Sequence, residues 1–436
     1  MLKNPHEYVG HDVIKVDAES KTTGEAVYPN DIYFDDMLYA RVKRATHPHA
    51  YLKKLDISKA EAVPDVVTVI TAEDYPDLNN FGLILKDQPV LVGIDEKMRF
   101  MGDALAIVVA ETREAARKGV SLIETEVEEL EVISNPIRAM EEDSPIIHKE
   151  ENMYDSNIPK RNIARSNDLI KGDIDKGFAE ADLIVENEYT TQHLDQLPLQ
   201  NESGVGYYDS IDDQIKLWVA SQWIHDSQAD IAQSLGVDKD KVRIIQPAIG
   251  GAFGKKEDIS VHIHLALATL ETGKPVKMAY SREESMIAQS KRHPLIIKMK
   301  TGVKNNGKLT ALEVEVIGDT GAYASSGPAV IHKGLFHSTG PYEIENIKGK
   351  SYTVYTNNTY GGAMRGFGAT QMGFAYDSQM DIIAHKLGMD PLEFRYKNAF
   401  EKGSETATGQ ILNRSVNVKE TLAEAKEMME DKEGQK

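Results

Sequence analysis

The sequence predicts a mixed α/β fold of the α+β class that is divided into more than one domain. At 436 residues, and at roughly 150 residues per domain, the chain is long enough for about two to four domains with real hydrophobic cores. A strand, a helix and a second strand follow one another over residues 104–128, and helices and strands alternate again beyond residue 168. We therefore expect sheets that are covered by helices in both halves of the chain.

The first half supports a small mixed α/β domain over residues 1–148. Residues 13–26 alternate polar and apolar side chains before a turn and predict short strands and loops. Thr112 fits the N-cap of a helix whose buried face carries Ala116 and Val120. Apolar or alternating runs predict four strands, at residues 38–42, 66–70, 104–110 and 124–128.

A polar segment without periodicity, residues 149–167, is interpreted as a linker. The second domain is expected to run from residue 168 to residue 436. The dipeptide Asn306-Gly307 between two apolar runs predicts a hairpin, because both residues accept positive φ. The further elements expected here are helices at 227–235, 258–270, 371–387 and 417–431 and strands at 242–246, 295–303 and 309–317.

The charge balance excludes some classes of partner. Lys plus Arg is 50 and Asp plus Glu is 69, so the formal net charge is 50 − 69 = −19, which disfavours binding to nucleic acid. The longest apolar run, residues 104–110, is far short of the ~18 residues of a membrane span. The N-terminus has no apolar signal region. We expect a soluble, cytoplasmic protein that binds neither nucleic acid nor membrane.

The sequence contains no cysteine. A disulfide, a cysteine nucleophile, a thiolate zinc site and an iron–sulfur cluster are therefore excluded from this polypeptide. If the protein takes part in redox chemistry, its electron carriers belong to a bound cofactor or to partner chains.

Two glycine-rich stretches are candidate ligand-binding loops. In residues 250–254 a strand end, a glycine turn and a helix start leave backbone N–H groups free for an anion or an oxo ligand. On spacing alone an ordinary β–α turn is the simpler explanation, because neither dinucleotide-binding nor phosphate-loop spacing is present. In residues 361–368, Arg365 could bind an anionic group and Phe367 could stack on a flat substrate, although an exposed arginine without function is the simpler alternative.

Histidines give weaker signals. His262 and His264 lack a third ligand at metal-binding spacing, so we interpret them as histidines on a helix surface. His193, close to Asp195, could be a base, but a structural histidine is the simpler alternative. Carboxylates are too numerous for a catalytic pair to be chosen.

Taken together, these stretches resemble the molybdenum-binding subunit of the xanthine dehydrogenase/aldehyde oxidase family of molybdenum hydroxylases. The resemblance rests on many short motifs in the family's order, at residues 15–17, 21–26, 37–40, 48–50, 102–112, 221–222, 250–254, 281–284, 292–294, 320–323 and 365–368. It implies an N-terminal α/β-hammerhead domain over residues 1–148 and the first molybdopterin-binding domain over residues 168–436. The family's second cofactor-binding half is expected on a partner chain, because the chain stops after the first and its last helix looks like a natural end.

The resemblance also implies the chemistry. The family hydroxylates an electron-poor carbon with water as the oxygen source, using molybdenum on a molybdopterin. We expect the cytosine dinucleotide form of the pterin and a terminal sulfido or selenido ligand on the metal. The partners expected are a second molybdopterin-binding subunit, a [2Fe–2S] subunit and an FAD subunit. No catalytic residue is expected on this chain, since the general-base Glu would lie on the second subunit.

Site residues carry over position by position from the resemblance. Gln222 matches the glutamine that hydrogen-bonds a molybdenum ligand, and Phe253 and Gly254, with Gly251 and Ala252, match the segment at the apical oxo group. Arg365 matches an arginine beside the cofactor, so Gln222, Phe253 and Arg365 form the expected molybdenum environment. Residues matching substrate contacts are Glu257, Lys333 and Phe367.

Three departures from the family bear on function. The split of the cofactor-binding region is typical of large molybdopterin subunits of the nicotinate dehydrogenase type. Lys333 stands where xanthine dehydrogenases carry an arginine, and lysine lacks the planar two-point fork. Gln200-Asn201 replaces the more common Glu-Pro. The missing cysteine argues against a carbon monoxide dehydrogenase.

The expected substrate is an N-heteroaromatic compound. Glu257 favours a purine such as xanthine or hypoxanthine, and the split of the cofactor-binding region favours nicotinate as the alternative. A non-catalytic scaffold that keeps the family fold is a third possibility, and the intact Gln222, Phe253, Glu257, Arg365 and Phe367 argue against it.

Overall fold

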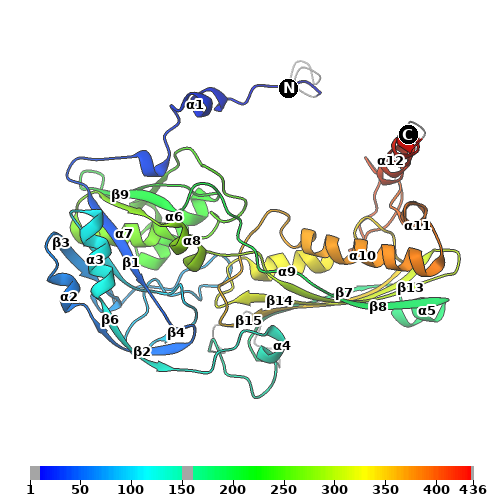
Figure 1. Cartoon of the computed structure of the whole chain (residues 1–436), viewed down its shortest axis with the longest axis horizontal. Coiled ribbons are helices and arrows are strands. Elements are labelled where there is room, and N and C mark those ends of the chain that lie inside the picture. Colours follow the sequence, from blue (N-terminus) through cyan, green and yellow to red (C-terminus); the bar gives the residue numbers. More distant parts are fainter. Residues whose placement is uncertain (1–9, 150–160, 434–436) are drawn as a thin grey trace.

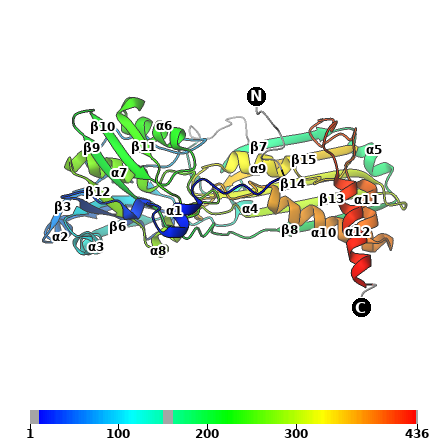
Figure 2. The ribbon, with the colours of Figure 1, turned by 90° about the horizontal axis from the view of Figure 1, so that it is seen from above.

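The structure, a computed structural model, describes residues 10–149 and 161–433. It has two lobes side by side along the long axis, each built on one large β-sheet (Figure 1). Seen from above, helix α1 (Ala18–Thr23) lies near the junction of the lobes, and helix α12 (Val418–Glu433) lies at the far end of the second lobe (Figure 2). The mixed α/β fold predicted from the sequence is confirmed.

The sheet of the first lobe combines strands from distant parts of the chain. Its order is β11-β10-β9-β12-β1-β5-β3. Strand β1 joins the early strands β5 and β3 to the later strands β9 to β12, because it pairs antiparallel with β5 and in parallel with β12. The strands are β1 (Leu38–Arg44), β3 (Val66–Ile70), β5 (Ala104–Ala110), β9 (Ser203–Asp209), β10 (Gln214–Val219), β11 (Val242–Ile245) and β12 (Val276–Ala279).

Strand β5 is buried along its whole length because helices cover both faces of the sheet. Ile107 and Val109 belong to the cluster that includes residues of helix α7 (Val261–Thr272). Ala106 and Val108 belong to the opposite cluster, beneath α2 (Ser58–Glu61) and α3 (Arg113–Leu122). A strand whose two faces are both buried has an uninterrupted apolar sequence. The sequence therefore predicts both ends of β5 correctly.

Helix α3 begins as expected, since the Thr112 side chain accepts a hydrogen bond from the Ala115 N–H at 3.1 Å. Strand β6 (Glu124–Glu129) follows, but it does not return to the sheet of β5. Instead it pairs with β2 (Ala50–Asp56) in a small sheet that also holds β4 (Lys97–Met98). The strand–helix–strand unit is therefore divided between two sheets.

The second lobe is a five-stranded sheet in the order β7-β15-β14-β13-β8, with α9 (Gly327–Phe336) and α10 (Ala369–Leu387) on one face (Figure 1). Apolar side chains of both helices and of the sheet form one core. The strands are β7 (Ile163–Lys171), β8 (Leu183–Thr190), β13 (Leu295–Val303), β14 (Leu309–Gly321) and β15 (Asn346–Tyr355). The other helices are α4 (Pro136–Ala139), α5 (Ile174–Ala179), α6 (Ile224–Leu235), α8 (Arg282–Ala288) and α11 (Pro391–Asn398).

Several sequence expectations are met and two are not. The strands at 66–70, 104–110 and 295–303 and the turn at Gly307, whose φ is +83°, are confirmed. The prediction of strands within residues 13–26 is wrong, because α1 is a short helix with no buried residue. Residues 163–167 of the expected linker belong to β7, whose polar side chains hid its pairing with β15, and residues 150–160 lie outside the described residues. Among the described helices none is long and apolar enough to cross a membrane.

Candidate active site

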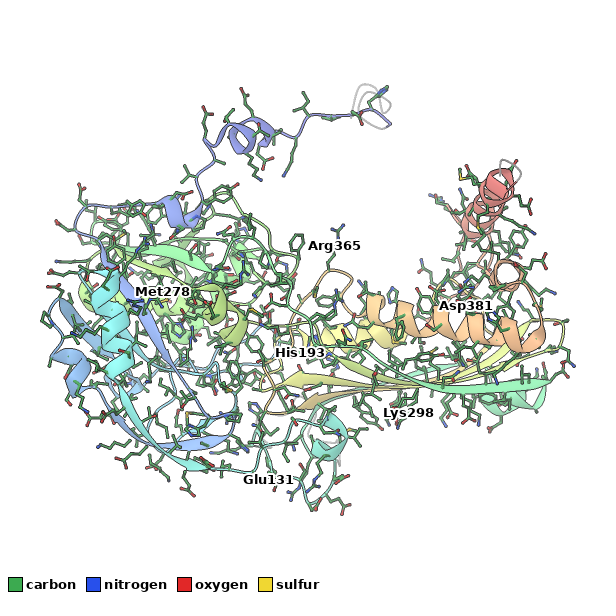
Figure 3. The ribbon with its side chains drawn as sticks, viewed as in Figure 1. Glu131, His193, Met278, Lys298, Arg365 and Asp381 are labelled. Carbon is green, nitrogen blue, oxygen red and sulfur yellow. The ribbon has the colours of Figure 1, made fainter. Side chains whose placement is uncertain are left out.

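The two glycine-rich stretches meet where the two lobes join. The first glycine loop, residues 250–254, connects β11 to α7, and the second glycine loop, residues 361–368, connects β15 to α10. The Arg365 N–H donates to the Phe253 carbonyl oxygen at 3.0 Å, which links the loops directly. The Arg365 side chain is exposed and points away from the ribbon above the junction of the lobes (Figure 3).

Glycine is required at two of the contacts that hold these loops together. A Cβ on Gly254, whose φ is +105°, would lie 2.3 Å from the Ala363 carbonyl oxygen. A Cβ on Gly368, whose φ is +91°, would lie 2.2 Å from the Val330 carbonyl oxygen in α9. Both positions combine a left-handed backbone with a close approach, which only glycine accepts. The two loops and α9 are consequently one contiguous unit.

Gln222 fixes the first glycine loop from the segment between β10 and α6. Its Oε1 accepts from the N–H of Gly254 at 3.0 Å and from the N–H of Lys256 at 3.3 Å. Its own backbone N–H donates to the Lys256 carbonyl oxygen at 2.8 Å. Within residues 10–149 and 161–433 nothing accepts from its Nε2, which is free to donate to a ligand.

The first loop offers free backbone donors. Among the described residues, the N–H groups of Gly251, Ala252 and Phe253 make no hydrogen bond, whereas that of Gly254 is taken by Gln222. Successive free N–H groups in a glycine turn form a concavity that suits an anion or an oxo group. Of the N–H groups that the resemblance assigns to the oxo group, those of Gly251, Ala252 and Phe253 are therefore available, and that of Gly254 is not.

Two phenylalanines have left-handed backbones. The φ angles are +56° at Phe253 and +52° at Phe367, in a region that costs non-glycine residues free energy and is enriched at functional sites. Phe253 is 48% exposed. The Nζ of Lys333, from α9, lies 5.8 Å from the centre of the Phe367 ring. An exposed cation beside a half-buried aromatic ring suits a flat, anionic ligand.

Glu257 lies three residues after the first loop, and its N–H donates to the Gly254 carbonyl oxygen at 3.1 Å. Burial, with the neighbouring Asp258 carboxylate as the smaller cause, raises the pKa of Glu257 to about 7. Its Oε2 is buried and has no partner within the described residues. A carboxyl group that is neutral up to about pH 7 can donate a hydrogen bond to a ligand.

The histidines do not form a metal site. His262 and His264 lie inside the core, 3% and 4% exposed, so the prediction of surface histidines is wrong: α7 is packed on all sides. His264 contacts the Val90 carbonyl oxygen at 3.1 Å. His193 is exposed, and the Asp195 carboxylate makes its ion pairs with lysines. Within the part of the chain that the structure describes, no three His, Cys, Asp or Glu residues could hold a metal ion.

This donor set fits a metal that is carried by an organic cofactor. The described residues offer amide and cationic donors, from Gln222, the first loop and Arg365, and no anionic ligand set. Such donors bind oxo groups and phosphates, while the metal's own ligands come from the cofactor.

A buried ionic cluster behind the loops was missed at the sequence level. Asp195 contacts the Nζ of Lys255 with both oxygens at 2.8 Å and the Nζ of Lys291 at 3.0 Å. The three residues are separated by up to 96 positions, since 291 − 195 = 96. Only the pair Lys255-Lys256, directly after a glycine loop, could have drawn attention to it.

Comparison with known proteins agrees with the fold. Residues 23–131 match the family described as "Aldehyde oxidase and xanthine dehydrogenase, a/b hammerhead domain", and residues 154–399 match the "Molybdopterin cofactor-binding domain". The chain belongs to the xanthine dehydrogenase/aldehyde oxidase family of molybdenum-dependent oxidoreductases.

This chain covers different shares of the length of its relatives. The chain is 43% identical to the nicotinate dehydrogenase large molybdopterin subunit of Eubacterium barkeri, over 97% of this chain and 96% of that protein. It is 31% identical to the xanthine dehydrogenase molybdenum-binding subunit of Escherichia coli O157:H7, over 89% of this chain but only 52% of that protein. The aldehyde oxidoreductase structure from Desulfovibrio gigas superposes with a TM-score of 0.88 at 29% identity, covering 95% of this chain and 46% of that one. The chain thus spans about half the length of the latter two.

Proposed function

We propose that this chain is the large molybdopterin-binding subunit of a molybdenum-dependent dehydrogenase with several subunits that hydroxylates an N-heteroaromatic substrate. One observation carries the proposal. The two glycine loops are hydrogen-bonded to each other through Arg365 and Phe253, and Gln222 is hydrogen-bonded to the first loop. Similarity to the Eubacterium barkeri subunit over nearly the full length of both chains supports it. A decayed scaffold would not need these contacts.

In this proposal the bound molybdenum cofactor supplies oxidation of an electron-poor carbon, with water as the oxygen source. The Nε2 of Gln222, the N–H of Phe253 and the Arg365 guanidinium would hold the cofactor's oxo and anionic groups. Phe367 would stack on the substrate ring. The general-base Glu would come from a second molybdopterin subunit.

The substrate that the site favours is a flat ring with an anionic substituent, such as nicotinate. The ammonium of Lys333 is close enough to the Phe367 ring for a carboxylate on a stacked substrate to reach it. A purine is the second candidate, because the neutral carboxyl of Glu257 could donate to a ring nitrogen. Lysine in place of an arginine fork weakens the purine alternative.

The remaining parts of the proposal come from the family resemblance. They are a cytosine dinucleotide form of the pterin, a terminal sulfido or selenido ligand, and [2Fe–2S] and FAD partner subunits in the cytoplasm. The complete lack of cysteine supports the partner subunits, because this chain cannot ligate a cluster.

The test is substrate profiling of the whole complex, purified with its molybdenum content measured. Nicotinate, xanthine and hypoxanthine are offered in ¹⁸O-labelled water. We expect nicotinate to give the highest kcat/KM and the product to carry ¹⁸O. Active fractions without molybdenum, or product oxygen that does not come from water, would contradict the proposal. A clear preference for hypoxanthine would replace nicotinate by the second candidate.

A further inference from the structure

Residues 195–202, between β8 and β9, contact both glycine loops; we call them the bracing segment. We infer that the bracing segment fixes the spacing of the two glycine loops and thereby positions the cofactor. Gln200 and Gln196 make the direct contacts, and Asp195 acts through two lysines. The inference rests on the proposed function, since it assumes that the cofactor binds between the loops.

Gln200 holds the first glycine loop by two hydrogen bonds to one residue. The Gln200 N–H donates to the Gly250 carbonyl oxygen at 3.0 Å, and the Gly250 N–H donates to the Gln200 Oε1 at 2.6 Å. A Cβ on Gly250 would lie 2.8 Å from the Gln200 Cβ, so the two backbones are in close contact. The Gln200 carbonyl oxygen also accepts from the Lys256 Nζ at 2.9 Å.

Gln196 holds the second glycine loop. Its Nε2 donates to the Ala363 carbonyl oxygen at 2.8 Å, and the residue is buried. The same carbonyl oxygen is the atom that excludes any side chain at Gly254 in the first loop. One peptide group is therefore held by the bracing segment on one side and by the first loop on the other.

Asp195 ties the two loops together by charge. Its partner Lys255 directly follows the first loop, and its other partner Lys291 is bonded to the second, because the Gly362 N–H donates to the Lys291 carbonyl oxygen at 2.8 Å. All three side chains are less than one tenth exposed. A buried carboxylate between two lysines resists displacement of either loop, since each displaced charge would be left unpaired.

The segment is itself anchored at its far side. The Arg282 guanidinium donates to the carbonyl oxygens of Pro198 and Leu199 at 2.7 and 3.1 Å. The N–H of Leu197 donates to the Asp195 carboxylate at 2.7 Å, which fixes the turn inside the segment. A rigid support of this kind matters because shifts of about 1 Å in a reacting group can cost about 100-fold in rate.

The test compares three variants of the assembled complex. Gln200→Met removes the acceptor of the Gly250 N–H, Gln200→Glu keeps an acceptor there, and Gln196→Met removes the donor to Ala363. Gln228→Met is the matched control, because Gln228 in α6 also bonds backbone carbonyls, at 2.6 and 3.1 Å, but on the outer edge of the first lobe. The readouts are molybdenum content, the electron paramagnetic resonance spectrum of Mo(V), and kcat and KM.

We expect Gln200→Met and Gln196→Met to retain molybdenum, to show a changed Mo(V) spectrum, and to lose kcat by about 10- to 100-fold with little change in KM. Gln200→Glu should restore the wild-type spectrum and rate. Wild-type spectra and rates in both methionine variants would overturn the inference. Failure of either methionine variant to assemble while Gln228→Met assembles would also overturn it, because the segment would then serve assembly and not cofactor geometry. A wild-type complex without molybdenum would instead refute the proposed function.

Discussion

Glu257 is the residue of the site whose charge state most depends on its surroundings. Its pKa is raised from 4.5 to about 7 by burial and by Asp258, so the folded protein holds a proton there that the unfolded chain has lost. Stability from this group is accordingly full below about pH 4.5 and declines as the pH rises toward 7. The same proton makes the carboxyl a hydrogen-bond donor below about pH 7.

The first prediction concerns this proton. In the wild-type complex kcat/KM for an anionic heteroaromatic substrate should fall above pH 7, because ionised Glu257 no longer donates and repels the substrate. Glu257→Gln keeps an N–H donor and should remove this fall. Initial rates between pH 6 and pH 9 measure it. Parallel pH profiles in both proteins would show that Glu257 does not contact the substrate.

The second prediction concerns Lys333. Lys333→Met should raise KM for nicotinate about tenfold, because a charge-assisted hydrogen bond to the carboxylate is lost. KM for hypoxanthine, which lacks a carboxylate, should change little. Lys350→Met, which changes an exposed side chain on β15 in the second lobe, is the control. An equal change for both substrates would remove Lys333 from substrate recognition.

Among single residues, the sequence predicts which side chains line the site. It does not predict the bracing segment that holds the two glycine loops. Gln222, Phe253 and Arg365 belong to motifs within single loops, and the structure brings them together. Asp195 and Gln196 carry no local motif, and Gln200 is marked only by its departure from the family's Glu-Pro. The partners of these residues lie 50 to 167 positions away. Contacts of such separation follow from topology and leave no periodicity in the sequence.

Of the secondary-structure elements, the strands that are predicted best from the sequence are those whose residues are all equally buried. Strand β5 is apolar throughout because both faces are buried. Strand β7 begins with the buried Ile163 and Ala164 and continues with four polar residues, so its sequence has no apolar run. Strand β12, only four residues long, was missed because its register depends on β1 and β9, from distant parts of the chain. The division of the chain into domains at residues 149–167 stays a prediction.

The third prediction tests the contact between the two glycine loops. Gly254→Ala should abolish most of the activity, because the Cβ of the new alanine would lie 2.3 Å from the Ala363 carbonyl oxygen. It should also lower the free energy of unfolding by more than Gly273→Ala does. Gly273, at the C-terminus of α7, also has a positive φ, of +61°, but no atom lies within 4 Å of the position that a Cβ would take there. Its substitution should cost only about 1–2 kcal/mol of backbone strain. Thermal unfolding and turnover of both variants measure the difference, and equal losses would mean that the loop contact is unimportant.

In the whole molecule, buried carboxylates connect the first 149 residues to the second lobe. Asp87 accepts from the Tyr355 hydroxyl and from the Ala324 N–H, both at 2.8 Å. Burial is the main cause that raises the pKa of Asp87 from 3.8 to about 7. Asp103 similarly accepts from the Tyr323 hydroxyl at 2.6 Å. The two lobes are therefore joined by polar contacts that are sensitive to pH.

The fourth prediction follows from Asp87. Between about pH 4 and pH 7 the unfolded chain loses the Asp87 proton while the folded protein keeps it, so stability falls as the pH rises, by up to about 1.4 kcal/mol per pH unit. Asp87→Asn should flatten this slope, and the exposed Asp77→Asn should not. Thermal unfolding across this pH range checks it. An unchanged slope in Asp87→Asn would show that another group causes the pH dependence of the stability.

The central claim is that this chain forms one part of a molybdenum site that another subunit completes. The most direct measurement is metal analysis and turnover of the chain expressed alone beside the complex isolated with its partners. We predict stoichiometric molybdenum and oxidation of a heteroaromatic substrate in the complex, and neither in the chain alone. A molybdenum-free chain that oxidises a heterocycle by itself, or an active complex without molybdenum, would contradict the account.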